Sequence, residues 1–356
     1  MPATRLLIIS NGHGEDSIAA EIARRLPVSV SAEAYPTLGD GRAYENIIPI
    51  VGPRAHLPSE GWRNTKNSVA RDVMGGGIST VWPGLRFIRA ARGKYDRVMV
   101  VGDMMGVYGA WITGHRGIVY VDVYKTGFGS AYLGLDKWIM RTTARTVFCR
   151  SEKLARSLDE AGINARAAGN VMMDTIPRAN GMTLPRRRGL ALTILPGSRG
   201  HALDNFALQA KALALVPPEI RPDLFLAVAG SVDEAALRER AAGLEITYLP
   251  GRALGDMLAT SDFVLSQAGT ATIQAIGLGR PAITFRTAED RPSRFRQESQ
   301  LFGDGRLAVE AEPQAIAAAI TTLATDPGER LRRAAVGRER IGPPGAIDAI
   351  IAELTR

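Results

Sequence analysis

Short apolar runs alternate with longer stretches of helical periodicity along most of this 356-residue chain. Strands of a parallel sheet are buried on both faces, so they need near-continuous apolar runs, and helices must lie between them to cover those faces. A chain of this length exceeds what one hydrophobic core usually organises. The sequence therefore predicts an α/β protein with two doubly wound parallel-sheet domains.

The apolar runs give the strands that we expect in each domain. In the first half they are residues 5–10, 46–51, 97–102, 117–123 and 146–150, and in the second half 190–195, 224–229, 245–249, 263–266 and 281–285. Residues 174–189 combine Pro, Asn and Gly with three consecutive Arg and lack hydrophobic periodicity, which is typical of a linker. We place the first domain at residues 1–175 and the second at residues 176–340.

A single cysteine, Cys149, excludes an internal disulfide framework, a Cys-based zinc site and a Cys-x-x-Cys redox centre. The first residues run at once into a short apolar strand, and the most apolar later stretch, residues 98–114, is interrupted by Asp103. We therefore expect neither a signal peptide nor a membrane-spanning helix. The expected location is the cytoplasm or a membrane surface.

The excess of basic residues lies almost wholly in the first half, where residues 1–180 hold 23 Lys and Arg against 16 Asp and Glu. A basic half of this kind is expected to bind nucleic acid, an anionic membrane or an anionic substrate. Alternatively, its Arg residues simply cover a solvated surface. Because no recognisable nucleic-acid-binding fold interleaves the basic residues with aromatic ones, nucleic acid is disfavoured as a partner.

The loop after the first strand, residues 10–16, is rich in Gly and charged side chains. Ligands of open parallel sheets bind beyond the carboxyl ends of strands, where Gly lets the backbone approach closely. Asp16 is also placed to cap the next helix, which is its purely structural interpretation. Ser17 breaks the G-x-G-x-x-G dinucleotide pattern, which disfavours a nicotinamide enzyme. The candidate site residues here are Asn11, Gly12, His13, Gly14, Glu15 and Asp16.

Two loops of the second half have the features of a diphosphate site. Residues 195–200 follow a buried strand, and Arg199 offers a two-pronged partner to phosphate oxygens. Residues 266–275 end a strand in small residues and begin a helix with Thr, so free N–H groups meet the positive end of the helix dipole. We expect a sugar nucleotide to bind Gly197, Ser198, Arg199, Gly269, Thr270, Ala271, Thr272 and Gln274.

Several kinds of chemistry lack their motifs in this chain. There is no Walker A lysine loop, no G-x-S-x-G elbow, no H-E-x-x-H pair and no Asp-x-Asp. We therefore predict no metal and no cofactor.

Residues 57–92 mix aromatic and aliphatic side chains with basic ones, which is typical of a helix in an anionic membrane interface. Trp62, Trp82 and Arg86 are the membrane-facing candidates; alternatively, the apolar residues cover the sheet and the Arg residues face water.

Five short segments occur in an order and spacing that a known family shares. They are Asn-Gly-His-Gly-Glu-Asp at 11–16, Val-Gly-Asp at 101–103, Gly-Asn-Val-Met-Met-Asp at 169–174, Leu-Pro-Gly-Ser-Arg at 195–199 and Gly-Thr-Ala-Thr at 269–272. The chain thus resembles lipid-A-disaccharide synthases, and more closely the lipid-A-disaccharide-synthase-like proteins of cyanobacteria and plants. The likeness runs from about residue 5 to about residue 310.

The resemblance implies a GT-B glycosyltransferase, in which two Rossmann-like domains face a central cleft. The first domain would bind the acceptor and the second the nucleotide sugar, and residues 341–356 would form a helix that packs back on the first domain. It further implies an inverting, metal-independent hexosyltransferase of glycolipid biosynthesis, peripheral to the inner membrane, that uses a UDP-sugar and a lipid acceptor.

Two departures from the family bear on the substrates. Met104, Met105 and Gly106 follow Asp103, so the second Asp of the family's acidic loop is missing, and Gln274 stands where many GT-B enzymes have a ribose-binding Glu. The substrate pair is therefore expected to differ from lipid A precursors. A UDP-sugar 2-epimerase and a catalytically inactive sugar-nucleotide- or lipid-binding protein are the alternatives.

Transfer needs a base to take the proton of the acceptor hydroxyl. Asp103, at the end of a buried strand, is the first candidate for this base. His13, Glu15 and Asp16 of the first loop follow it.

Overall fold

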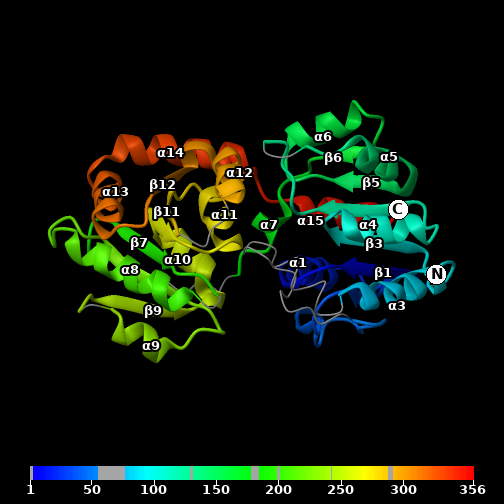
Figure 1. The fold of residues 1–356 in the computed structure, drawn as a ribbon, viewed down its shortest axis with the longest axis horizontal. Helices are drawn as coiled ribbons and strands as arrows, with labels where there is room; N and C mark the ends of the chain where they lie inside the picture. Colours follow the sequence, from blue (N-terminus) through cyan, green and yellow to red (C-terminus); the bar gives the residue numbers. More distant parts are fainter. Residues whose placement is uncertain are drawn as a thin grey trace. The chain divides into compact units, whose positions relative to one another are not determined.

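The computed structural model describes residues 3–54, 77–128, 131–177, 184–198, 201–241, 243–287 and 292–356, without the side chains of His13, residues 77–80 and Arg294. Contacts between residues divide the chain into two units. Unit 1 comprises Met1–Thr175 and Pro344–Arg356, and unit 2 comprises Ile176–Pro343. Each unit holds one six-stranded sheet with helices packed against it (Figure 1).

The sheet of unit 1 is parallel throughout and has the order β2-β1-β3-β4-β5-β6. Its strands are β1 (Thr4–Ser10), β2 (Val30–Pro36), β3 (Arg97–Gly102), β4 (Ile118–Asp122), β5 (Ala144–Phe148) and β6 (Ala165–Arg166). The apolar residues 6–9 of β1 are fully buried, as a strand covered on both faces requires. The predicted doubly wound α/β architecture is confirmed.

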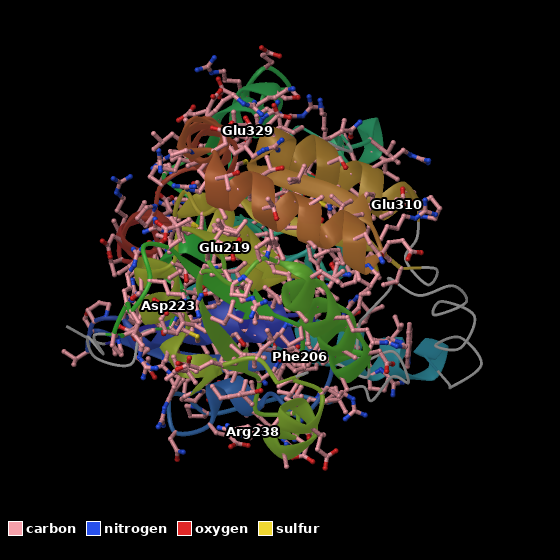
Figure 2. All side chains as sticks on the ribbon, turned by 90° about the vertical axis from the view of Figure 1, so that its left-hand side faces the viewer. Phe206, Glu219, Asp223, Arg238, Glu310 and Glu329 are labelled. Atoms are coloured by element: carbon pink, nitrogen blue, oxygen red, sulfur yellow. The ribbon has the colours of Figure 1, made fainter. Side chains whose placement is uncertain are left out.

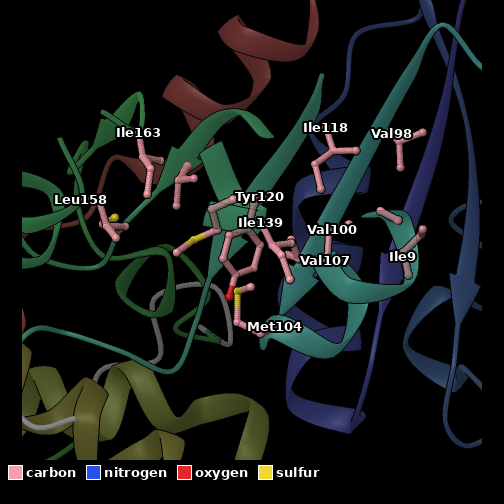
Figure 3. Packing of buried hydrophobic residues seen from close by; sticks show 14 of the residues in the cluster. Ile9, Val98, Val100, Met104, Val107, Ile118, Tyr120, Ile139, Leu158 and Ile163 are labelled. Carbon is pink, nitrogen blue, oxygen red and sulfur yellow. The ribbon is translucent and has the colours of Figure 1, made fainter. Parts of the chain in front are cut away.

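The helices of unit 1 are α1 (His13–Arg24), the 3-10 turn η1 (Arg42–Tyr44), α3 (Gly77–Ala90), α4 (Met104–Ile112), α5 (Gly134–Thr143), α6 (Glu152–Asp159), α7 (Val171–Asp174) and α15 (Ala346–Leu354). Three helices of unit 1 begin at a residue whose side chain caps them, whereas α1 and α15 begin after a Gly. Side chains of Asp103, Ser151 and Asn170 accept a first-turn N–H of α4, α6 and α7. Figure 3 shows the core that results, with Val107 of α4 close to Val100 of β3.

One predicted strand of unit 1 is wrong. We expected residues 46–51 to form a strand, whereas the second strand is β2, at Val30–Pro36. Asn46 has a φ of 61°, a left-handed conformation that interrupts an extended backbone, and Ile50 forms an isolated bridge with Ala34. The sequence did not indicate β2 because an edge strand needs no continuous apolar run, and this one alternates Ala with Ser and Glu.

The sheet of unit 2 is also parallel, in the order β12-β11-β10-β7-β8-β9. Its strands are β7 (Ala191–Leu195), β8 (Asp223–Val228), β9 (Ile246–Pro250), β10 (Phe263–Ser266), β11 (Ala282–Arg286) and β12 (Arg306–Glu310). Phe206 is fully buried in this unit, while Arg238 and Glu310 belong to its charged outer surface (Figure 2).

Helices separate these strands in unit 2. They are α8 (Ala202–Leu215), α9 (Glu234–Glu239), η2 (Gly251–Ala253), α10 (Leu254–Thr260), α11 (Thr270–Gly277), α12 (Pro292–Phe302), η3 (Gly303–Gly305), α13 (Pro313–Thr325) and α14 (Pro327–Ile341). The sequence prediction includes neither β12 nor α14. Asp326 caps α14 by accepting the N–H of Glu329 at 2.9 Å, which starts a new helix directly after α13.

The last helix, α15, is held to unit 1 at both ends. The Asp174 carboxylate accepts the N–H groups of Gly345 and Ile347 at 2.7 and 3.0 Å. At the other end, the buried Glu353 accepts the Thr146 hydroxyl at 3.0 Å and pairs with Arg145. These contacts fasten α15 to β5 and to the end of α7.

Within the described ranges, no helix is both long and apolar enough to cross a bilayer.

Candidate functional site

Strand order reverses once in each sheet, between β1 and β3 in unit 1 and between β7 and β10 in unit 2. At such a switch point the following helices leave toward opposite faces of the sheet, which opens a crevice at the carboxyl ends of the strands. Asn11 and Gly12 follow β1, residues 13–16 form the first turn of α1, and Asp103 follows β3. Residues 196–198 and 267–269 follow β7 and β10. All the loops that the sequence indicated therefore lie at one of these two points.

Asn11 and Asp103 meet at the switch point of unit 1. Asn11 Nδ2 donates a 2.6 Å hydrogen bond to Asp103 Oδ1, which also accepts the N–H of Met105 at 2.8 Å. Gly102 makes room for this contact, because a Cβ at that position would lie 1.9 Å from Asn11 Oδ1. The carboxylate of Asp103 is thus held by a side chain from one loop and by the first turn of α4.

Asp103 lines a hollow of about 210 Å³ in unit 1. Apolar and aromatic groups, two carboxylates and one ammonium group surround it: Asp103, Met104, Met105, Tyr108, Tyr124, Lys125, Tyr132 and Asp136. The Tyr108 hydroxyl donates to Asp136, and this bond raises the pKa of Tyr108 to about 12. Lys125 Nζ lies 4.4 Å from the centre of the Tyr132 ring. Apolar walls with a few charged groups are typical of a small-molecule site.

Glu15 reaches the same region from the first turn of α1. It is 7% exposed and accepts a hydrogen bond from the hydroxyl of Tyr124, a residue of the hollow. Gly12 is buried and lies directly against the Glu15 side chain, because a Cβ at position 12 would lie 2.5 Å from Glu15 Oε2. Gly14 is exposed. The side chain of His13 lies outside the described residues.

Asp16 points elsewhere and is 1% exposed. Its Oδ1 accepts the Ser10 hydroxyl at 2.6 Å, and Ser10 Oγ also lies 2.6 Å from the Tyr44 hydroxyl. Asp16 Oδ2 has no hydrogen-bond partner among the described residues. Burial raises the pKa of Asp16 to about 7, and the neighbouring Glu15 adds to the shift. Asp16 is buried against Ser10 and is not among the residues that line the hollow.

Seven of the eight residues that line the hollow were not site candidates from the sequence: Met104, Met105, Tyr108, Tyr124, Lys125, Tyr132 and Asp136. One signal was present, because residues 123–129, Val-Tyr-Lys-Thr-Gly-Phe-Gly, follow a buried strand and contain two Gly. That combination is the one that singled out residues 10–16. Tyr108 and Asp136 had no such signal, since each looks like an ordinary helical residue.

In unit 2, several strand-end loops are tied together at the carboxyl edge of the sheet. Gly197 has a φ of 106°, and a Cβ there would lie 3.4 Å from Gln267 O. The Gln267 side chain donates to Phe285 O at 2.8 Å, and Ser198 O accepts the Ser231 hydroxyl at 2.6 Å. The loops after β7, β8 and β10 therefore lie against one another. Arg199 is outside the described residues.

Residues of the third predicted loop divide into exposed and buried positions. Gly269 and Thr270 are exposed at the start of α11, and Ala271 is half-buried. Thr272 and Gln274 are each 3% exposed, and the Thr272 hydroxyl lies 2.6 Å from that of Ser266. Helix geometry leaves the first N–H groups of α11 without helical partners. Gly269 and Thr270 are therefore accessible from solvent at this helix end, while Thr272 and Gln274 are buried beneath them.

No protein-family model matches the chain. It is 32% identical over 140 residues to the lipid-A-disaccharide synthase of Saccharophagus degradans, a match that covers 35% of either chain. It is 29% identical over 194 residues, 52% of this chain and 54% of the other, to the UDP-N-acetylglucosamine--N-acetylmuramyl-(pentapeptide) pyrophosphoryl-undecaprenol N-acetylglucosamine transferase of Azotobacter vinelandii. The chain thus spans about a third to a half of the length of these curated relatives. The resemblance to lipid-A-disaccharide synthases is confirmed.

Solved structures match over nearly the whole chain. The calicheamicin glycosyltransferase CalG4 gives a TM-score of 0.63 at 16% identity, covering 100% of this chain and 99% of that one. MurG of Acinetobacter baumannii gives 0.59 at 17% identity, covering 99% of each. The chain has the GT-B fold. The UDP-GlcNAc 2-epimerase of Neisseria meningitidis, bound to UDP-GlcNAc, also matches, with 0.59 at 14% identity, over 99% of this chain and 100% of that one.

In this GT-B chain, the surface predicted for membrane contact is only partly exposed. Trp82 of α3 is 62% exposed, and the Arg86 guanidinium lies 5.5 Å from the centre of its ring. On the opposite side of α3, the Phe87 ring packs on Tyr35 with 4.7 Å between ring centres. Phe87 thus covers the sheet, as one of the two interpretations expected, while membrane contact of the face that carries Trp82 stays a prediction; residues 57–76 lie outside the described residues. Trp62 lies outside the described residues.

A second exposed apolar surface of the GT-B chain lies on α4 and α5. We call it the α4–α5 surface, and its members, each 42–72% exposed, are Met105, Ile112, Leu133, Leu135 and Trp138. Trp111 and Trp138 meet edge to face with 5.6 Å between ring centres, which joins the two helices. Arg141 is exposed on α5, and Arg116 is exposed in the loop between α4 and β4. This surface was not expected from the sequence, because an uninterrupted apolar helix such as α4 is normally buried.

Proposed function

We propose that this chain is an inverting, metal-independent glycosyltransferase that moves a sugar from a UDP-sugar to a lipid-linked acceptor at a membrane surface. The observation that carries the proposal is that Asp103 lines the hollow at the switch point of unit 1, next to the exposed α4–α5 surface. Met105 belongs to both, because it is part of this surface and also lines the hollow. By their names, the curated relatives make a lipid-linked disaccharide or transfer N-acetylglucosamine to a pyrophosphoryl-undecaprenol acceptor.

In this proposal the acceptor hydroxyl lies in the hollow and Asp103 takes its proton. The oxygen attacks the anomeric carbon from the face opposite UDP, so the bond to UDP breaks with inversion. The hydrogen bonds from Asn11 and from the N–H of Met105 both end on Asp103 Oδ1 and hold the carboxylate, which leaves Oδ2 for the proton transfer.

UDP binds in unit 2, at the loops after β7 and β10. The departing diphosphate gains negative charge as the glycosidic bond breaks. The first N–H groups of α11, near Gly269 and Thr270, and the guanidinium of Arg199 stabilise that charge without a cation. In the described part of the chain, no group of three or more His, Cys, Asp or Glu is placed to hold a metal ion.

The α4–α5 surface should attach the chain to anionic membranes. Its apolar side chains would enter the interface, and Arg116 and Arg141 would contact lipid phosphates. We expect the chain to co-sediment with vesicles that contain anionic lipid at low salt, and the double variant Leu135→Glu, Trp138→Glu to bind at least about fivefold more weakly.

Leu331→Glu is the matched control for this measurement, because Leu331 is 69% exposed on α14 of unit 2. It should bind vesicles like the wild-type chain. Equal binding of the double variant and the wild type would contradict the assignment of this surface, and loss of binding by Trp82→Glu alone would shift the contact to α3.

Incubation of the protein with UDP-sugars and a membrane lipid extract, in the presence of EDTA, tests the proposed reaction. We expect release of UDP together with a lipid heavier by one sugar residue, detected by mass spectrometry, whose new linkage has the anomeric configuration opposite to that of the donor. An epimerised UDP-sugar without glycolipid would indicate the 2-epimerase. Binding without turnover would indicate the inactive binding protein.

A further inference from the structure

A buried carboxylate at the end of β4 holds three residues of the hollow. Asp122 is 1% exposed. Its Oδ1 accepts the backbone N–H groups of Tyr124 and Lys125 at 2.8 and 3.1 Å, and its Oδ2 accepts the hydroxyl of Tyr132 at 2.7 Å. Tyr124, Lys125 and Tyr132 all line the hollow. One side chain thus fixes a loop and an aromatic ring that lie in different segments.

The network around Asp122 extends through a second tyrosine. The Tyr120 hydroxyl lies 3.1 Å from that of Tyr132 and 3.2 Å from Gly102 O, and its one proton is shared between these two oxygens, because the proton of Tyr132 goes to Asp122. The network therefore ends on the backbone of Gly102 and not on the carboxylate of Asp103, which has its own partners. Among the described residues, the Asp103 carboxylate is held by Asn11 and by the N–H of Met105, and none of the hydrogen bonds of Asp122 ends on it.

Burial of a carboxylate is unfavourable unless donors and an opposite charge compensate it. Burial raises the pKa of Asp122, and the buried Arg150 guanidinium, which donates to Val123 O at 2.8 Å, opposes that shift. The donors that hydrogen-bond to Asp122 all belong to the wall of the hollow. If Asp122 served only to stabilise the end of β4, its hydrogen-bond donors would not need to come from the residues that line the hollow.

We propose that Asp122 is a positioning residue of the acceptor site, which fixes Tyr132 and the backbone of Tyr124 and Lys125 in the geometry that binds the acceptor. The inference rests on the proposed function, because it assigns the hollow to the acceptor. Weakening the network should therefore raise the KM for the acceptor. It should leave kcat and the KM for the UDP-sugar nearly unchanged, because Asp103 and unit 2 are not altered.

Tyr132→Phe and Asp122→Asn test the inference, with the membrane lipid extract as the varied acceptor. We expect the apparent KM for the extract to rise about threefold to tenfold in Tyr132→Phe, the effect of losing one hydrogen bond, with kcat within twofold. Tyr95→Phe is the matched control. It removes a tyrosine hydroxyl that donates to a carboxylate, Glu33, at the amino end of the same sheet, and it should change neither constant.

Two results for Tyr132→Phe would overturn the inference. One is an unchanged KM for the extract. The other is a general impairment, in which kcat and the KM for both substrates worsen together and the melting temperature falls. Tyr132→Phe keeps the ring and the Asp122 carboxylate, so its KM remains decisive if Asp122→Asn does not fold.

If the wild-type chain forms no glycolipid, the proposed function fails, and hydrogen exchange decides the positioning role alone. Bonds to a charged acceptor are about twice as strong as neutral ones. The amides of Tyr124 and Lys125 should therefore exchange at least about fivefold faster in Asp122→Asn than in the wild type. They should exchange at the wild-type rate in Tyr95→Phe. Equal exchange in Asp122→Asn would contradict the role.

Discussion

Replacement of Asp103 by Asn should lower kcat by about 10²–10⁴-fold, the range expected for loss of a general base, with UDP affinity within twofold of wild type. Asn caps a helix as well as Asp does, so the start of α4 and the hydrogen bond from Asn11 should persist. The substitution then removes little besides the negative charge that accepts the proton. Steady-state transfer to the lipid extract and calorimetric titration with UDP measure the two quantities.

Two further variants complete this test. Asp159→Asn changes an exposed carboxylate at the end of α6 and should leave kcat unchanged. Glu15→Gln should have a smaller effect than Asp103→Asn, because the Glu15 carboxylate is already bound by Tyr124. If Glu15→Gln abolished turnover while Asp103→Asn retained it, the base would be Glu15.

Replacement of Asp16 by Asn should stabilise unit 1 at pH 8 by about 2–4 kcal/mol and leave its stability at pH 4 nearly unchanged. Burial raises the pKa of Asp16 to about 7. The folded chain therefore binds more protons than the unfolded chain between about pH 4 and pH 7, and the free energy of unfolding falls as the pH rises through this range. An Asn at this position carries no charge and avoids the loss.

Urea unfolding at pH 4, 6 and 8 measures this difference. All four Trp residues lie between residues 62 and 138, so Trp fluorescence follows the unfolding of unit 1. Asp159→Asn should show no such gain at pH 8, because its carboxylate is exposed. If the free energy of unfolding of Asp16→Asn equalled that of the wild type at every pH, ionisation of Asp16 in the folded chain would cost no stability.

Glu15 and Asp16 show how far a sequence pattern reaches. Both follow the same Gly-rich loop, and the sequence gives no reason to separate them. Consecutive residues of a helix point about 100° apart. That rotation directs Glu15 to Tyr124 at the hollow and Asp16 to Ser10 inside the fold. The loop was therefore predictable, but the partner of each carboxylate was not.

Other features depended on contacts that no local pattern records. The strand expected at residues 46–51 is wrong because the left-handed Asn46 interrupts it, and the edge strand β2 takes its place. Tyr108 and Asp136 form part of the hollow because α4 and α5 lie side by side, with Trp111 against Trp138. The exposure of the α4–α5 surface likewise follows from how these helices pack.

By itself, the sequence determined the α/β class, the two parallel sheets and the strand ends that carry the site loops. It did so because doubly covered strands need apolar runs, and loops that approach a ligand need Gly and polar residues directly after them. Only the tertiary structure decided that Asp103 and not Asp16 lines the hollow, that Asp122 holds three of its residues, and that an apolar helix pair faces outward. Burial and hydrogen bonding are set by residues far apart in the chain, and local sequence does not encode those distances.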